Sequence, residues 1–225
     1  MNTKKLFKGI AILVIASVGI VRGSTVPELK LNGGELVFDA SGAVSYRAVA
    51  GQANLAFGFY APGWSPRSQW KLGPDRIQFE ATGDKEWTWK NKFSQGDGVG
   101  GELKQVVRST EDGVEISYLL TVDSGFRFEE GSRGPFIELV LPAASSDGQS
   151  VKIAGKTVAL PADNVWAYGD SVVVPSLDLL IQANRGMSLS VWKASKGRGN
   201  LVRFALKPNR TEEGNELYEA SFTLR

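Results

Sequence analysis

The period of the apolar residues is the feature that most constrains the fold of this chain. From residue 24 onward, apolar residues recur at every second position in short runs, and Gly, Asp, Asn and Pro separate the runs. Successive side chains of a strand point to opposite faces of a sheet, so this alternation is typical of strands. In residues 114–121, Val114, Ile116 and Tyr118 share one face, and the polar residues Glu115 and Ser117 between them point to the other face. After residue 24 the sequence has no convincing amphipathic helix, so the pattern predicts an almost entirely β protein.

Turn signals between the runs define the connections. Asp112-Gly113 separates the expected strands 102–109 and 114–121, and an Asp-Gly pair supplies the positive-φ turn that a tight hairpin prefers. Asp39-Ala40-Ser41-Gly42 is a second expected hairpin turn. Asn184-Arg185-Gly186 is expected to turn between two further strands, 177–183 and 187–193. Short strands joined by such turns are expected to pair antiparallel.

The strand count and the connections predict the fold class. About a dozen short strands without crossover helices indicate an all-β, two-layered antiparallel β-sandwich of jelly-roll or supersandwich type. We expect residues 24–225 to form a single domain, because neither half alone has the pattern of a closed core. The Gly-rich stretch Gln95–Glu102 is expected to be a long loop inside this domain.

The N-terminus has the pattern of a cleavable signal peptide, assigned to residues 1–23. Three lysines precede the thirteen uncharged residues 9–21. A membrane-spanning helix needs about 20 apolar residues, so the run fits a secretory signal better than an anchor, which is the alternative. Val21 and Gly23 suit a cut before Ser24, and a cut before Ile20 is also compatible. The expected location is periplasmic or extracellular, with no membrane span after removal of the signal.

Removal of the signal changes the charge balance. It takes four of the 26 basic residues and no acidic one, which leaves 22 basic residues against 24 acidic ones, a net charge of −2. Nucleic-acid-binding domains are usually strongly basic. The composition therefore gives no support to a nucleic-acid partner.

The sequence contains no cysteine and no histidine. Disulfides, thiolate metal sites and cysteine nucleophiles are thereby excluded. The lack of histidine excludes Ser-His-Asp and Cys-His catalysis and zinc sites that contain histidine. An enzyme with this composition would have to use carboxylates, lysine, tyrosine or arginine, and the sequence predicts no cofactor.

Carboxylates form no catalytic motif. Sugar hydrolysis needs two facing acids, about 5 Å apart for retention or about 6.5–9.5 Å for inversion. Glu129 and Glu130 are adjacent, so on a strand they would point to opposite faces. Glu80, Glu86 and Glu102 lie near aromatic segments without a spaced acidic motif. No catalytic residue is predicted.

Oxygen ligands for calcium occur at two places, Asp97 and the set Asp163, Asn164 and Asp170. Neither has the alternating acidic spacing of a dedicated calcium loop. No metal site is predicted.

Tryptophans give the strongest ligand-binding signal. Trp64 and Trp70 lie in a loop rich in Pro and Gly, Ala61–Pro74, with Arg67 between them. Exposed indoles stack on the apolar faces of sugar rings, and the planar guanidinium of Arg67 can donate to neighbouring hydroxyls. Loops at the ends of sandwiches often carry binding sites. The alternative is that both rings fold back and plug an open end of the sandwich.

Two further aromatic pairs are candidates. Trp87 and Trp89 are two residues apart in an expected strand, so they share one face and are predicted as stacking residues. Packing of both rings in the core is the competing interpretation. Trp166 and Tyr168 are expected in another loop and come third.

The second half of the chain resembles known sandwich domains. The segments are Val106-Val107-Arg108, residues 113–118, residues 136–142 and residues 151–161. Their order resembles the β-sandwich accessory domains of secreted bacterial glycoside hydrolases, and more loosely the supersandwich of galactose-mutarotase-like domains. The catalytic histidines of mutarotases have no counterpart here, so the resemblance implies no epimerase activity and transfers no site residue.

Three function classes follow from these observations. The leading one is an exported, non-catalytic sandwich that binds carbohydrate or assists polysaccharide processing, with a glycan as partner. The alternatives are a carboxylate-dependent polysaccharide-active enzyme and a structural or protein-interaction domain of the envelope. Exposed coplanar aromatics, a cleft with two facing acids and a broad apolar patch distinguish the three.

Overall fold

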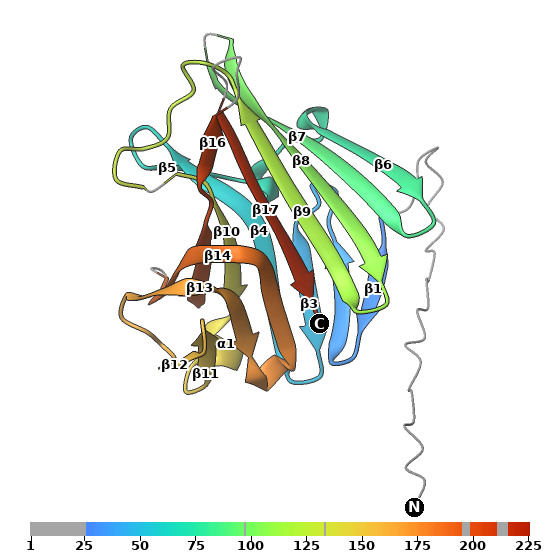
Figure 1. The fold of residues 1–225 in the computed structure, drawn as a ribbon, viewed down its shortest axis with the longest axis vertical. Helices are drawn as coiled ribbons and strands as arrows, with labels where there is room; N and C mark the ends of the chain where they lie inside the picture. Colours follow the sequence, from blue (N-terminus) through green and yellow to red (C-terminus); the bar gives the residue numbers. More distant parts are fainter. Residues whose placement is uncertain (1–25, 97, 133, 195–198, 211–215) are drawn as a thin grey trace, which may run out of the picture.

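The computed structural model describes residues 26–96, 98–132, 134–194, 199–210 and 216–225, which form seventeen strands with antiparallel pairings (Figure 1). The strands are β1 (Glu28–Leu31), β2 (Gly34–Phe38), β3 (Val44–Ala48), β4 (Gly51–Ala61), β5 (Ser65–Ser68), β6 (Ile77–Gly83), β7 (Glu86–Gly96), β8 (Val99–Thr110), β9 (Gly113–Val122), β10 (Phe136–Leu141), β11 (Ser150–Ile153), β12 (Lys156–Ala159), β13 (Val165–Val174), β14 (Leu179–Lys193), β15 (Asn200–Ala205), β16 (Pro208–Arg210) and β17 (Glu216–Leu224). Helical segments are short: α1 (Ala143–Ser146) and the 3₁₀ turns η1 (Gln69–Lys71), η2 (Pro74–Arg76) and η3 (Pro175–Leu177). The predicted all-β class is confirmed.

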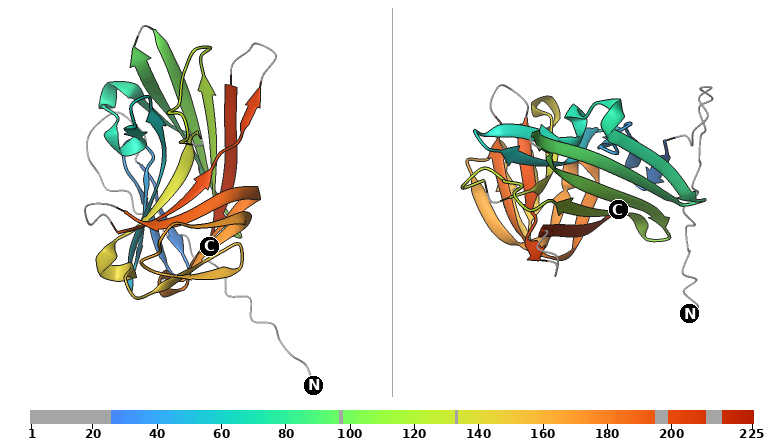
Figure 2. Two further views of the ribbon diagram at one scale, coloured as in Figure 1. Left: turned by 90° about the vertical axis from the view of Figure 1, so that its left-hand side faces the viewer. Right: turned by 90° about the horizontal axis from the view of Figure 1, so that it is seen from above.

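The strands form two layers that one long strand connects. The first layer has the order β1-β2-β3-β4-β10-β15-β14-β13. The second layer has the order β6-β7-β8-β9-β17. Strand β14 pairs with β17 through residues 181–183 and with β15 through residues 188–193. Seen from above, the orange strands gather at one end of the molecule and the green strands extend toward the other (Figure 2).

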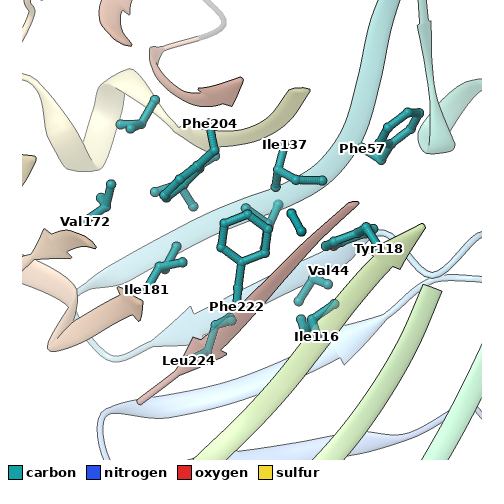
Figure 3. Packing of buried hydrophobic residues seen from close by; sticks show 14 of the residues in the cluster. Val44, Phe57, Ile116, Tyr118, Ile137, Val172, Ile181, Phe204, Phe222 and Leu224 are labelled. Atoms are coloured by element: carbon teal, nitrogen blue, oxygen red, sulfur yellow. The ribbon is translucent and has the colours of Figure 1, made fainter. Parts of the chain in front are cut away.

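The core lies between the layers, where the apolar faces of both sheets meet (Figure 3). The ring of Phe204 on β15 contacts that of Phe222 on β17, with centroids 5.0 Å apart. Phe57 on β4 and Phe93 on β7 are 5.8 Å apart. Because these rings come from opposite layers, the alternation of apolar residues in the sequence becomes a single shared interior.

The hairpin between β8 and β9 confirms the turn predicted at Asp112-Gly113. Gly113 has φ +138°, and a Cβ at this position would lie 2.2 Å from the carbonyl oxygen of Leu224. Glycine is therefore required here both by its backbone conformation and by the close approach of the C-terminal strand.

Gly113→Ala is expected to cost about 2–5 kcal/mol of unfolding free energy, because the positive φ and the backbone clash add together. Gly155→Ala is the matched control: Gly155 has φ +79° and no atom within 4 Å of an added Cβ. That variant is expected to cost only about 1–2 kcal/mol. Urea unfolding of both variants measures the difference, and equal costs would contradict the role of the Leu224 contact.

Three sequence-based expectations about connections are wrong. Asn184-Arg185-Gly186 is not a turn but part of the continuous strand β14; it lies at an irregularity of the β13–β14 ladder, where β14 passes from β17 to β15. The Gly-rich stretch Gln95–Glu102 is mostly strand, since β7 extends to Gly96 and β8 begins at Val99; Asp97 lies outside the described residues. Trp166 and Tyr168 belong to strand β13 rather than to a loop.

In the described part of the chain, no helix has the length and apolar character needed to cross a bilayer.

Candidate functional site

A concave surface lies on the outer face of the first layer, where β4, β10, β15, β14 and β13 are neighbours. It encloses about 500 Å³. We call it the aromatic pocket, because aromatic side chains form much of its lining. Its lining includes Tyr60, Trp64, Phe136, Asp163, Asn164, Trp166, Ser190, Trp192 and Arg203.

Strand register brings the floor of the pocket together. Trp166 on β13 is opposite Ser190 on β14, Ser190 is opposite Arg203 on β15, and Arg203 is opposite Glu138 on β10. Directly opposed residues of neighbouring strands place their side chains on the same face. A single cross-strand row therefore joins four residues that are far apart in the sequence.

Arg203 is fixed at the centre of this floor. Its Nε donates to Oε2 of Glu138 at 2.5 Å, and one terminal nitrogen donates to the hydroxyl of Tyr60 at 2.9 Å. Its guanidinium carbon lies 3.9 Å from the ring centroid of Phe136 and 4.4 Å from that of Trp192. These contacts hold the arginine by an ion pair and by aromatic faces at once. The side chain is therefore a preorganised part of the floor.

Trp64 stands at the edge of the pocket, in the turn between β4 and β5. It has φ +55°, and its backbone N–H donates to a carboxylate oxygen of Glu129 at 2.9 Å. The indole is 57% exposed and contacts the ring of Tyr60 edge to face, with centroids 5.4 Å apart. A non-glycine residue held at positive φ is strained, and such strain concentrates at functional sites.

Two polar groups of the pocket come from the segment before β13, and Ser190, Lys193 and Arg203 supply others from β14 and β15. Asp163 and Asn164 line the pocket, and Asn164 has φ +52°, so two of the four described non-glycine residues at positive φ belong to this site. Trp166, which follows them, is 44% exposed. Exposed indoles beside a carboxylate and an amide offer stacking surfaces together with acceptors and donors for hydroxyl groups.

The three residues predicted from the loop Ala61–Pro74 are separated in the structure. Trp64 lines the aromatic pocket, whereas Arg67 lines a different depression together with Lys92. Trp70 is 42% exposed and lies over a third hollow, which includes Glu138. The three side chains therefore belong to three different surfaces and do not form one site. Neither Trp64 nor Trp70 is buried, so neither ring plugs an end of the sandwich.

The prediction of Trp87 and Trp89 as stacking residues needs correction. Their exposed fractions are 6% and 0%. Strand β7 turns these indoles toward the first layer, and the ring of Trp89 stacks on Phe38 of β2, with centroids 5.3 Å apart. Lys90 and Lys92 are exposed on the opposite face of the strand. Both tryptophans therefore pack in the core, as the competing interpretation expected.

Sequence reasoning missed Trp192 and Arg203. A signal for Trp192 was present: in β14, Met187, Leu189 and Val191 are buried and alternate with residues of the outer face. The alternation places Trp192 among serines on that outer face, where an indole is unexpected. Arg203 carries no comparable signal, because its partners Tyr60 and Glu138 become neighbours only through the sheet order.

Within the described residues, each carboxylate near the aromatic pocket either already has an ion-pair or hydrogen-bond partner or has no second carboxylate beside it. Glu138 forms an ion pair with Arg203, and Glu129 accepts the Trp64 N–H. Asp163 is the one carboxylate among the described residues that line the aromatic pocket. Across the described ranges, no three acidic, histidine or cysteine side chains are grouped so that they could hold a metal ion.

Comparisons with known proteins show the fold. No protein-family description matches the sequence, and no curated protein does. A 4-alpha-glucanotransferase from Thermococcus litoralis superposes with a TM-score of 0.53 at 9% identity, over 96% of this chain and 39% of that one. A galactose mutarotase related enzyme from Lactobacillus acidophilus superposes with a TM-score of 0.50 at 11% identity, over 89% of this chain and 97% of that one.

These superpositions confirm the looser of the two sequence resemblances, since the chain has the sandwich fold of galactose-mutarotase-like proteins. No match supports the resemblance to accessory domains of glycoside hydrolases. The chain spans about two fifths of the glucanotransferase that it matches, so the activity of that enzyme is not transferred to it.

Proposed function

We propose that this protein is an exported, non-catalytic β-sandwich that binds a saccharide in the aromatic pocket. The observation that carries the proposal is the pair of exposed indoles, Trp64 and Trp166, beside Asp163 and Asn164. A pyranose ring has an apolar face that stacks on an indole and hydroxyl groups that need donors and acceptors. The carbohydrate-related structural neighbours are compatible with such a ligand.

The composition of the pocket favours binding over hydrolysis. Both mechanisms of glycoside hydrolysis use two carboxyl groups across the scissile bond. Asp163 has no second carboxylate beside it among the described lining residues, and Glu138 is paired with Arg203. A saccharide in this pocket would therefore be held rather than cleaved.

Exposed aromatics also favour a glycan over a protein partner. The large exposed apolar side chains of the described ranges are Val26 and Val49 together with the aromatic residues Trp64, Trp70, Trp166 and Tyr168. A protein-interaction surface would present a broad contiguous apolar patch. Separate aromatic rings set among polar groups fit a sugar better.

Trp64→Ala and Trp166→Ala are each expected to weaken saccharide binding about tenfold or more, because each removes an aromatic anchor from the pocket. Both side chains are exposed, so the melting temperature should change by only a few degrees. A glycan array identifies the ligand, and titration calorimetry with a short oligosaccharide from it measures the change. Trp70→Ala, which removes an exposed indole of the neighbouring hollow, should bind the short ligand within about twofold of the parent protein.

Binding that survives both pocket substitutions would contradict the site. Loss of binding only in Trp70→Ala would move the site to the hollow beside Glu138. Absence of any glycan ligand for the intact protein on the array would contradict the function itself.

Export is the second part of the proposal and rests on the pattern of residues 1–23. The mature protein recovered from its host is expected to begin at Ser24, or at Ile20 if the alternative cut is used. Intact mass and N-terminal sequencing of protein from the periplasm or the medium test this. Mature protein that retains Met1 would contradict it.

A further inference from the structure

A second concave surface lies between β5, the 3₁₀ turns η1 and η2, and β7. It encloses about 250 Å³, and four cationic side chains line it: Arg67, Lys71, Arg76 and Lys92. No acidic side chain is among its described lining residues. We call it the basic groove.

The cations of the basic groove have no compensating acids in ion-pair contact. The three ion pairs found in the described ranges are Lys30–Glu35, Arg108–Glu86 and Arg203–Glu138, so none involves the groove. Asp75, next to Arg76, points its carboxylate at Gly73, where Oδ1 would be 2.7 Å from an added Cβ. The positive charge of the groove is therefore left for a ligand.

Positive charge continues beyond the groove along the outer face of the second layer. Lys90 and Lys92 are two residues apart on β7 and share this face. Lys90 is directly opposite Lys104 of β8, and Lys92 is opposite Glu102, with which it forms no ion pair. Like charges directly opposed across strands destabilise a sheet. The Lys90–Lys104 pair therefore does not stabilise the sheet by itself, although Lys104 also lies close enough to Glu86 to help lower the pKa of that carboxyl.

We propose that the basic groove binds the carboxylate or sulfate groups of an acidic polysaccharide. This inference rests on the proposed glycan-binding function and names the class of glycan. The hairpin of β4 and β5 connects the two surfaces, because its turn carries Trp64 of the aromatic pocket and β5 carries Arg67 of the groove. Arg67 is directly opposite Phe59, on the inner face of β4, and the aromatic pocket lies on the outer face, so a glycan chain that contacts both surfaces has to pass round the edge of this hairpin.

The groove fits an acidic glycan better than a nucleic acid. Single-stranded nucleic acids need exposed aromatic rings on which the bases stack. Phe93 is the aromatic residue among the described lining residues of the groove, and it is only 6% exposed. The chain as a whole has nearly balanced charge, with 26 basic and 24 acidic residues. Arginine and lysine here can pair with acidic groups, and no exposed aromatic ring among the described lining residues offers bases a stacking platform.

The test compares dextran sulfate, polygalacturonate and unmodified dextran as probes, at an ionic strength of about 0.15 M. The parent protein should bind at least one charged polymer about tenfold or more tightly than dextran, and rising salt should weaken that binding. The double variant Arg67→Gln/Lys92→Gln should lose about tenfold or more of this affinity. The control Lys152→Gln/Lys156→Gln removes two exposed lysines of β11 and β12 and should change affinity by less than about twofold.

Charged and neutral polymers that bind equally, or a groove variant that binds like the parent, would overturn the proposal. Tighter binding of a single-stranded DNA oligonucleotide than of either charged glycan, lost in the groove variant, would also overturn it. The variant Trp64→Ala/Trp166→Ala separates this result from the proposed function. If the aromatic pocket is not a sugar site, the variant Trp64→Ala/Trp166→Ala keeps full affinity for the charged polymers. If only the basic groove is wrongly assigned, the groove variant binds like the parent, and loss of the two indoles still weakens binding.

Discussion

Arg203→Met is expected to lower the unfolding free energy by about 3–5 kcal/mol. The substitution leaves the largely buried Glu138 carboxylate, beside the pocket, without its cation, and an unpaired buried charge is strongly destabilising. It also removes the guanidinium that lies over the rings of Phe136 and Trp192. Urea unfolding, monitored by circular dichroism, measures the change.

Arg108→Met is the matched control, because Arg108 forms an ion pair of the same length with Glu86 at the surface. Exposed pairs contribute about 0–1 kcal/mol, so this variant should be nearly as stable as the parent. The double variant Arg203→Met/Glu138→Leu should regain much of the lost stability, since no unpaired charge is left. Equal costs for Arg203→Met and Arg108→Met would show that the floor of the pocket is not held by the Arg203–Glu138 pair.

Trp89→Ala is expected to cost about 3–5 kcal/mol, the usual loss when a buried large aromatic side chain is truncated. The indole is fully buried, and its ring lies 5.3 Å from that of Phe38 and 4.7 Å from that of Phe79. Trp70→Ala removes an indole that is 42% exposed and should cost much less. Thermal and urea unfolding of both variants separate a core tryptophan from a surface one. A Trp89→Ala protein as stable as Trp70→Ala would contradict the packing of β7 against the first layer.

The sequence predicts the class of fold well because the period of two appears within each strand. Residues 114–121 and the Asp112-Gly113 turn correspond to β9 and its hairpin with β8. Connections are harder to predict, because a short segment that contains Asn and Gly has the composition of a turn even where it lies within a strand. Asn184-Arg185-Gly186 therefore indicated a turn, whereas the neighbouring strands keep β14 continuous through an irregular ladder.

The candidate site is predicted only in part. Trp64 stands out locally, as an indole in a turn rich in Pro and Gly. The floor depends on pairings between distant segments: Tyr60 and Arg203 are 143 positions apart and share a hydrogen bond. For Trp87 and Trp89, local alternation fixes that they share a face but not which face meets the first layer. The flanking lysines marked the outer face and were the available clue.

The most direct test of saccharide binding in the aromatic pocket is a crystal structure of the protein with the best oligosaccharide from the glycan array. We expect a pyranose ring stacked on Trp64 or Trp166, with hydroxyl groups hydrogen-bonded to Asp163 or Asn164. An oligosaccharide bound elsewhere on the molecule, with the aromatic pocket unchanged, would contradict it.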